Sequence, residues 1–172
     1  MKLRPHPAAL LLLLAACATA PRGEAGWSFP AAFTATQVVD VRSPRGSQAL
    51  LASVWRAPRR LEIAFLDPAL QVPLVVATLE EGRFVEHRLV AFPLASSDVE
   101  ELMRDVDALY AARGWRPDGA VWTDRVGRWT VELDRPAATE GCSFPQRIEM
   151  HPSGASMPRI EVRTLDVRCG TR

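Results

Sequence analysis

Apolar and polar side chains alternate in short runs over residues 33–92, which is typical of β-strands that bury one face. Two of these runs, residues 50–54 and 61–65, place their apolar side chains on the same face if Pro58-Arg59 closes a tight hairpin. The connections between the runs are too short for parallel crossovers. The pattern therefore predicts an antiparallel meander.

Asp67-Pro68 interrupts this pattern, and residues 70–79 and 83–91 form a further pair that turns at Glu81-Gly82. Strand patterns return later in the chain, after a helical segment. The later strands are expected at residues 121–123, 129–131, 144–150 and 160–167.

One helix is predicted between these two groups of strands. Ser97 and Glu100 form a capping box at its start, and Gly114 stands where a left-handed helix stop is expected. The apolar residues that recur at helical spacing are Val99, Leu102, Met103, Val106, Leu109 and Tyr110. This apolar stripe must be covered, and the sheet is the available partner.

The expected fold class is mainly β (α+β), with about eight to ten strands and one principal helix. Two arrangements fit the pattern: a curved antiparallel sheet or half-barrel with the helix packed as a lid on its concave face, and a closed barrel with an external helix. Periodicity does not distinguish them.

The first residues of the chain have the composition of a secretory signal. Lys2 and Arg4 precede an apolar run that ends in Leu14-Ala15-Ala16-Cys17, as in bacterial lipoprotein precursors. The run is too short to span about 30 Å of hydrocarbon. This resemblance implies a signal peptide at residues 1–16, cleavage before Cys17, and acylation of Cys17. A plain secretory peptide or an uncleaved anchor is the alternative.

The residues after Cys17 indicate a location and a linker. Residues 17–26 are small and polar and contain Pro21 and Gly23, which suits a flexible tether ahead of a domain at residues 27–172. An aspartate after the acylated cysteine retains lipoproteins in the inner membrane of enterobacteria. Ala18 stands there, so we expect an anchor in the outer membrane, on its periplasmic face.

Two cysteines remain after acylation, and an oxidising compartment favours a disulfide between them. If residues 151–158 connect the last two strands, strand partners have numbers that sum to about 311, and Cys142 faces Cys169 at a distance suitable for a disulfide. Two free buried thiols are the alternative. The apolar phase of the last strand slips near Arg163, which suggests a β-bulge.

Charge and motifs exclude several classes of function. Without the signal, 19 basic side chains face 20 acidic ones, which gives no support for binding nucleic acid. The histidines, cysteines and carboxylates lack metal-ligand spacing, and no nucleophile motif or phosphate-binding glycine loop is present. The sequence therefore predicts no catalytic residues, no metal and no cofactor.

Three segments resemble the LolA/LolB superfamily of lipoprotein carriers, and more narrowly a family of short bacterial lipoproteins of unknown function within it. They are residues 33–37 (FTATQ), residues 58–68 (PRRLEIAFLDP) and residues 92–94 (FPL) before the helix. The resemblance implies a half-barrel whose helical lid encloses an apolar cavity for acyl chains. It also implies a periplasmic LolA-like carrier as a partner, and genes for aryl-polyene lipids nearby.

The resemblance directs attention to the inward positions of the strands and to the helix stripe. Each methylene removed from water contributes about 0.8 kcal/mol, so such a cavity binds an acyl chain without catalysis. The expected cavity residues are Phe65, Leu74, Val76, Leu102, Val106, Leu109, Trp129 and Val131. Leu70, after the break at Asp67-Pro68, matches a membrane-contacting leucine of the acceptor LolB.

Two alternatives remain at this stage. The same residues can form an ordinary filled core, in which case the protein is a lipoprotein scaffold in an envelope assembly. An esterase or thioesterase acting on polyene lipids is the other alternative, and it lacks a nucleophile and base pair.

Overall fold

The computed structural model describes residues 26–44, 46–90, 94–139, 142–154 and 157–170. Its main feature is a ten-stranded antiparallel sheet, beside which lie a two-stranded sheet and one helix. The elements are β1 (Phe33–Ser43), β2 (Gly46–Ala57), β3 (Arg60–Leu66), β4 (Pro73–Glu80), β5 (Arg83–Arg88), α1 (Ser96–Ala111), β6 (Arg116–Asp118), β7 (Val121–Val126), β8 (Trp129–Asp134), β9 (Ala137–Thr139), β10 (Cys142–Phe144), β11 (Arg147–Pro152) and β12 (Arg159–Cys169).

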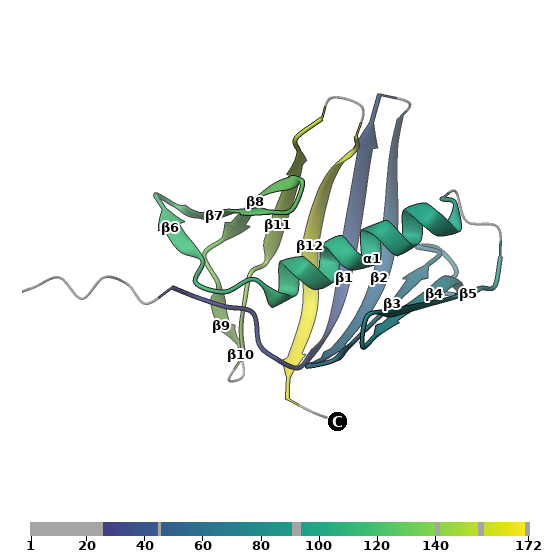
Figure 1. Ribbon diagram of the computed structural model, residues 1–172, viewed down its shortest axis with the longest axis horizontal. Helices are drawn as coiled ribbons and strands as arrows, with labels where there is room; N and C mark the ends of the chain where they lie inside the picture. The colour runs from purple at the N-terminus through teal and green to yellow at the C-terminus, as the bar shows by residue number, and fades with distance from the viewer. Residues whose placement is uncertain (1–25, 45, 91–93, 140–141, 155–156, 171–172) are drawn as a thin grey trace, which may run out of the picture.

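The large sheet is open. Its strand order is β5-β4-β3-β2-β1-β12-β11-β8-β7-β6, so the first and last strands of the chain pair at its centre and β5 and β6 form its two borders. Figure 1 shows the sheet bending around α1, which crosses in front of β12, β1 and β2. The curved-sheet arrangement with one covering helix is confirmed, and the closed barrel is wrong.

The predicted hairpin turns are present. Ala57 pairs with Arg60, so Pro58-Arg59 is a two-residue turn, and Val54 lies opposite Ile63 on the buried face. Between β4 and β5, Glu81 and Gly82 have φ angles of 49° and 78°. Positive φ at both central residues gives the turn that matches the twist of a hairpin.

The helix and its apolar stripe are confirmed, but its predicted caps are wrong. The N-cap is Ala95, no side chain caps the helix there, and Ser97 lies inside the first turn. At the other end the chain becomes extended at Ala112. Gly114 has a φ of 73° but lies further along, where its N–H donates to Ser28 Oγ. The helix therefore begins and ends without the predicted capping box and glycine stop.

The segment before β1 docks against the end of the helix. Trp27 and Trp115 exchange backbone hydrogen bonds of 3.1 and 2.8 Å. The Phe29 ring makes edge contacts with the rings of Tyr110 and Phe144, at centroid distances of 5.0 and 5.3 Å. This aromatic cluster fixes the point where the N-terminal chain enters the fold, beside the C-terminal end of α1.

The predicted bulge in the last strand is present. Thr36 pairs with Asp166 and Gln37 pairs with Thr164, so Leu165 has no partner on β1. Its side chain is exposed to solvent. The extra residue explains why the apolar pattern changes phase in this strand.

The disulfide between Cys142 and Cys169 is present, with the two Cα atoms 5.3 Å apart. The register that we expected for it is wrong. The numbers of paired residues on β11 and β12 sum to 310, not 311, and this pairing ends at Arg147 and Arg163. Cys142 instead belongs to the small β9–β10 sheet, so the bond ties that sheet to the end of β12.

Candidate functional site

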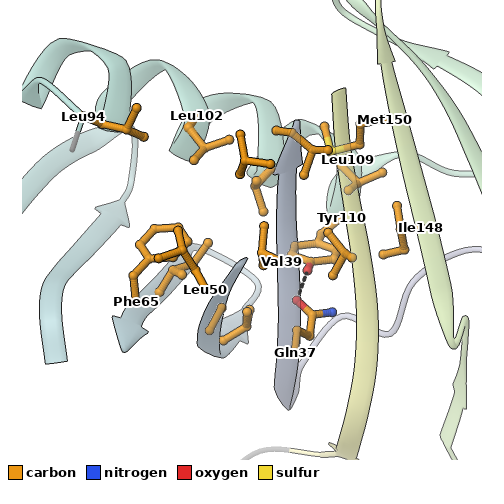
Figure 2. Close-up of a pocket in the computed structure, with 17 residues that line it drawn as sticks. Gln37, Val39, Leu50, Phe65, Leu94, Leu102, Leu109, Tyr110, Ile148 and Met150 are labelled. Atoms are coloured by element: carbon orange, nitrogen blue, oxygen red, sulfur yellow. Dashed lines mark hydrogen bonds between the residues drawn. The ribbon is translucent and has the colours of Figure 1, made fainter. Parts of the chain in front are cut away.

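An apolar hollow lies between α1 and the concave face of the sheet, with a volume of about 60 Å³. Figure 2 shows side chains from the helix and from the central strands pointing toward this space. Its lining comprises Gln37, Val39, Val41, Leu50, Ala52, Val54, Ile63, Phe65, Leu94, Leu102, Val106, Leu109, Tyr110, Ile148, Met150, Ile160 and Val162. All of these side chains except Gln37 and Tyr110 are apolar.

Four of the residues expected to line a cavity meet here. Phe65 comes from β3, and Leu102, Val106 and Leu109 come from the helix stripe. Leu102 and Val106 are only partly buried, whereas Leu109 is buried. The stripe therefore forms the roof of the hollow, and the sheet forms its floor.

Leu74 and Val76 do not line the hollow, and their expected orientation is wrong. Val75, the residue between them, pairs with Phe65 and is fully buried. The β3–β4 register shifts next to this pair, because Leu66 pairs with Pro73 and Leu74 is the extra residue. Val76 consequently lies on the same face as Ala64, away from the hollow.

Trp129 and Val131 are also outside the lining. Both are buried on β8, where Val131 pairs with the lining residue Met150, so they belong to the packed core beside the hollow. The Trp129 indole N–H donates to Asp105 Oδ2 at 2.9 Å. Trp129 therefore fastens the helix to the sheet.

A polar pair lies among the apolar lining residues. The Tyr110 hydroxyl donates to Gln37 Oε1 at 3.2 Å, and Gln37 Nε2 donates to Thr164 Oγ1 at 3.4 Å. Burial raises the pKa of Tyr110 to about 12, although the Gln37 hydrogen bond and the charge of Arg56 oppose the rise. Tyr110 is therefore a neutral hydroxyl at all physiological pH values.

Polar contacts hold the second half of the helix to the sheet. Arg56 Nη1 on β2 donates to the Tyr110 carbonyl oxygen at 2.9 Å, and Arg56 Nη2 lies 3.6 Å from Asp107 Oδ1. Arg128 Nη2 lies 2.7 Å from Asp105 Oδ2. Arg128 Nη1 also pairs with Glu101 Oε1, so the polar contacts of the helix extend from residue 101 to residue 110.

The size of the hollow limits what it can hold without movement. A cavity of about 150 Å³ takes up benzene, and the hollow measures only about 60 Å³. An acyl chain of many methylenes therefore requires the helix to move away from the sheet.

Leu70 lies in the turn between β3 and β4 and is 73% exposed. Asp67 Oδ1 accepts hydrogen bonds from the backbone N–H groups of Ala69 and Leu70, at 2.9 and 2.7 Å. Val72, in the same connection, is also exposed. The turn therefore presents an apolar tip that the Asp67 carboxylate holds in shape.

Several expectations concern residues outside the described ranges, namely the signal peptide at 1–16, Cys17, and the tether up to residue 25. Within the described ranges no group of His, Cys, Asp and Glu side chains has a geometry for holding a metal ion. The one helix described is not of a length and hydrophobicity that would cross a bilayer.

Sequence reasoning missed the lining residues on β1, β2, β11 and β12. Their signal was present, since Val39, Leu50 and Ile160 occupy alternating inward positions. Gln37 continues the alternation of Phe33 and Ala35 on β1, so a polar side chain at that position was the mark of an unusual inward residue.

No protein-family model matches the sequence, and no curated protein matches it significantly. Solved structures do resemble the fold. A LolA superfamily protein from Nitrosomonas europaea superposes with a TM-score of 0.52 at 13% identity, over 84% of this chain and 89% of that chain. A putative outer membrane lipoprotein-sorting protein domain from Vibrio parahaemolyticus gives a TM-score of 0.44 at 11% identity, covering 86% and 87%, which is too low to define a fold.

The chain therefore has a LolA/LolB-like fold. The resemblance noted from sequence segments is confirmed at this level. The similarity to the Nitrosomonas europaea protein concerns the course of the backbone.

Proposed function

We propose that this protein is a lipoprotein of the cell envelope that binds the acyl chains of lipidic cargo between α1 and the concave face of the sheet, without catalysis. One observation carries the proposal. Under the helix, on the open sheet, there is a hollow whose lining is almost completely apolar. Protein interiors are normally close-packed, and ligand sites are mostly apolar with a few polar groups, so the composition of this hollow supports it as the place where an acyl chain inserts once the helix has moved.

The energetics suit reversible binding. Each methylene that leaves water contributes about 0.8 kcal/mol, and part of this gain is spent in separating α1 from the sheet. The apolar contacts between helix and sheet offer little resistance to such a movement, because the acyl chain of the ligand replaces the contacts that the helix loses. The polar bonds around Asp105 and Tyr110 would keep the C-terminal end of the helix in place as a pivot.

The proposed location rests on the sequence. A lipobox that ends at Cys17 and a following Ala18 suit a lipid anchor in the outer membrane. Two or more acyl chains are needed for lasting attachment, and the triacylated cysteine of this class provides them. A periplasmic LolA-like carrier is the proposed donor or acceptor of cargo, and Leu70 is the proposed point of contact with the membrane.

Lipid binding by the full chain with Cys17→Ser tests the function. The purified protein should retain lipid in native mass spectrometry and should bind a fluorescent fatty acid saturably. Val106→Gln places an amide in the lining and should lower the affinity about tenfold, because an unpaired polar group in apolar surroundings costs roughly 1–3 kcal/mol.

Ala108→Gln is the matched control, since Ala108 lies on the same helix and is exposed. It should leave the affinity unchanged. Absence of retained lipid together with absence of saturable binding would refute the carrier function and favour a scaffold with a filled core.

A further inference from the structure

The polar pair inside the hollow has more hydrogen-bonding capacity than its partners use. Gln37 is 2% exposed and occupies an inward position of β1 where its neighbours on that face, Ala35 and Val39, are apolar. Its amide nitrogen carries two hydrogens. The described residues give that nitrogen one hydrogen bond, to Thr164, at a length of 3.4 Å.

A bond of 3.4 Å lies beyond the usual range of 2.7–3.2 Å. A buried amide normally finds full partners, because an unpaired donor in an apolar site is unfavourable. A leucine at this position would complete the apolar face of the strand. The amide is therefore either a structural link between β1, β12 and the helix, or a group kept for a ligand.

We infer that Gln37 Nε2, with its amide held in place by the hydrogen bond from the Tyr110 hydroxyl to Gln37 Oε1, binds the carbonyl oxygen of an acyl chain in the hollow, so that the cargo is an ester- or amide-linked acyl chain rather than a plain hydrocarbon. This inference rests on the proposed function. Figure 2 shows the Gln37 amide and the Tyr110 hydroxyl together within the set of lining side chains, with the lining residues Leu102 and Leu109 on the helix above.

The chemistry fits this arrangement. A carbonyl oxygen accepts hydrogen bonds and donates none, and the Gln37 amide offers an under-used N–H donor. The Tyr110 hydroxyl stays protonated because its pKa is about 12, so it keeps donating to Gln37 Oε1 and holds the amide in place. The alkyl part of the ligand would extend along the apolar lining that follows on β1 and β2, toward Val41 and Leu50.

A ligand-by-variant cycle tests the inference. Methyl decanoate and tridecane have the same number of non-hydrogen atoms and differ in the ester group. Their affinities are measured, by displacement of a fluorescent fatty acid, for the Cys17→Ser chain and for the same chain with Gln37→Leu. The variant should bind methyl decanoate about fivefold more weakly relative to tridecane, the value of one net hydrogen bond.

Equal changes for the two ligands would overturn the inference while leaving the carrier function intact. Failure of the Cys17→Ser chain to bind either ligand would overturn both. N-methyldecanamide separates amide-linked from ester-linked chains, and a selective loss for either carbonyl compound supports the proposal.

A second measurement does not depend on the folding of the variant. Methyl decanoate labelled with ¹³C at the carbonyl should show its infrared carbonyl band at lower wavenumber when bound than in an alkane solvent, because a hydrogen bond weakens the C=O bond. A band at the alkane position would overturn the inference.

Discussion

Filling the hollow should stabilise the protein and weaken its binding of a fatty acid at the same time. Ala52 on β2 is 1% exposed and lines the hollow, and its partner on β1 is Gln37. Ala52→Leu adds three carbon atoms in that direction. Unfilled volume costs about 24 cal/mol per Å³, so a hollow of about 60 Å³ costs about 1.4 kcal/mol in the free energy of unfolding.

Ala52→Leu should recover up to this amount. With a urea m-value of about 2 kcal/mol/M, the unfolding midpoint should rise by up to about 0.7 M, read from tryptophan fluorescence. The affinity for a fluorescent fatty acid should fall at least about tenfold, because the leucine occupies the space that the chain needs.

Ala49→Leu is the matched control, since Ala49 lies on the same strand and is exposed. It should change stability by less than about 0.5 kcal/mol and leave affinity unaltered. Retained lipid affinity in Ala52→Leu, with the leucine buried, would refute the assignment of the hollow as the binding site.

Three further predictions concern the disulfide, the charged outer face and the exposed turn. Replacing Cys142 by Ala and Cys169 by Ser removes the disulfide, whose cysteines are 27 residues apart in sequence, and chain entropy predicts a loss of about 3.6 kcal/mol in the free energy of unfolding. The unfolding midpoint of this variant in urea should match that of the reduced wild type, and a midpoint equal to that of the oxidised wild type would contradict the prediction. Burial alone would raise the pKa of Glu149, but a hydrogen bond from Arg159 and nearby positive charges lower it below its ordinary value of 4.5. The wild type should therefore exceed Glu149→Gln in stability by up to about 1 kcal/mol above pH 4.5 and lose this advantage as the pH falls below that value; parallel pH profiles would be the contrary result. Leu70→Ser should weaken cosedimentation of the Cys17→Ser chain with phospholipid vesicles and leave fatty-acid affinity intact, whereas equal cosedimentation would exclude a membrane role for this turn.

Much of the fold could be predicted because local signals were strong. The turns at Pro58-Arg59 and Glu81-Gly82 lie between clear alternating runs, and the helix stripe recurs at regular spacing. The helix caps failed, because packing on the sheet outweighs the small contribution of a cap residue. The disulfide was correct although its register was not, since Cys142 reaches Cys169 from another sheet.

The lining of the hollow could be predicted only in part. Leu74 to Ala77 is a continuous apolar run, so the sequence does not show which of its residues point inward. The bulge beside Leu66 places Val75 and Ala77 inward instead of Leu74 and Val76. Trp129 and Val131 were correctly expected to be buried. Their separation from the hollow depends on where the helix crosses the sheet, and a periodic pattern contains no information on that crossing.

The open sheet leaves two borders at which backbone groups can pair with another chain. Within the described residues β5 and β6 each have a neighbour on one side only. Such borders can nucleate aggregation. On β6 only three residues are strand, and Pro117 has no N–H to donate; on β5, Arg83 and Arg88 are exposed and charged. These features should keep neighbouring copies from pairing edge to edge while the concavity of the sheet stays accessible.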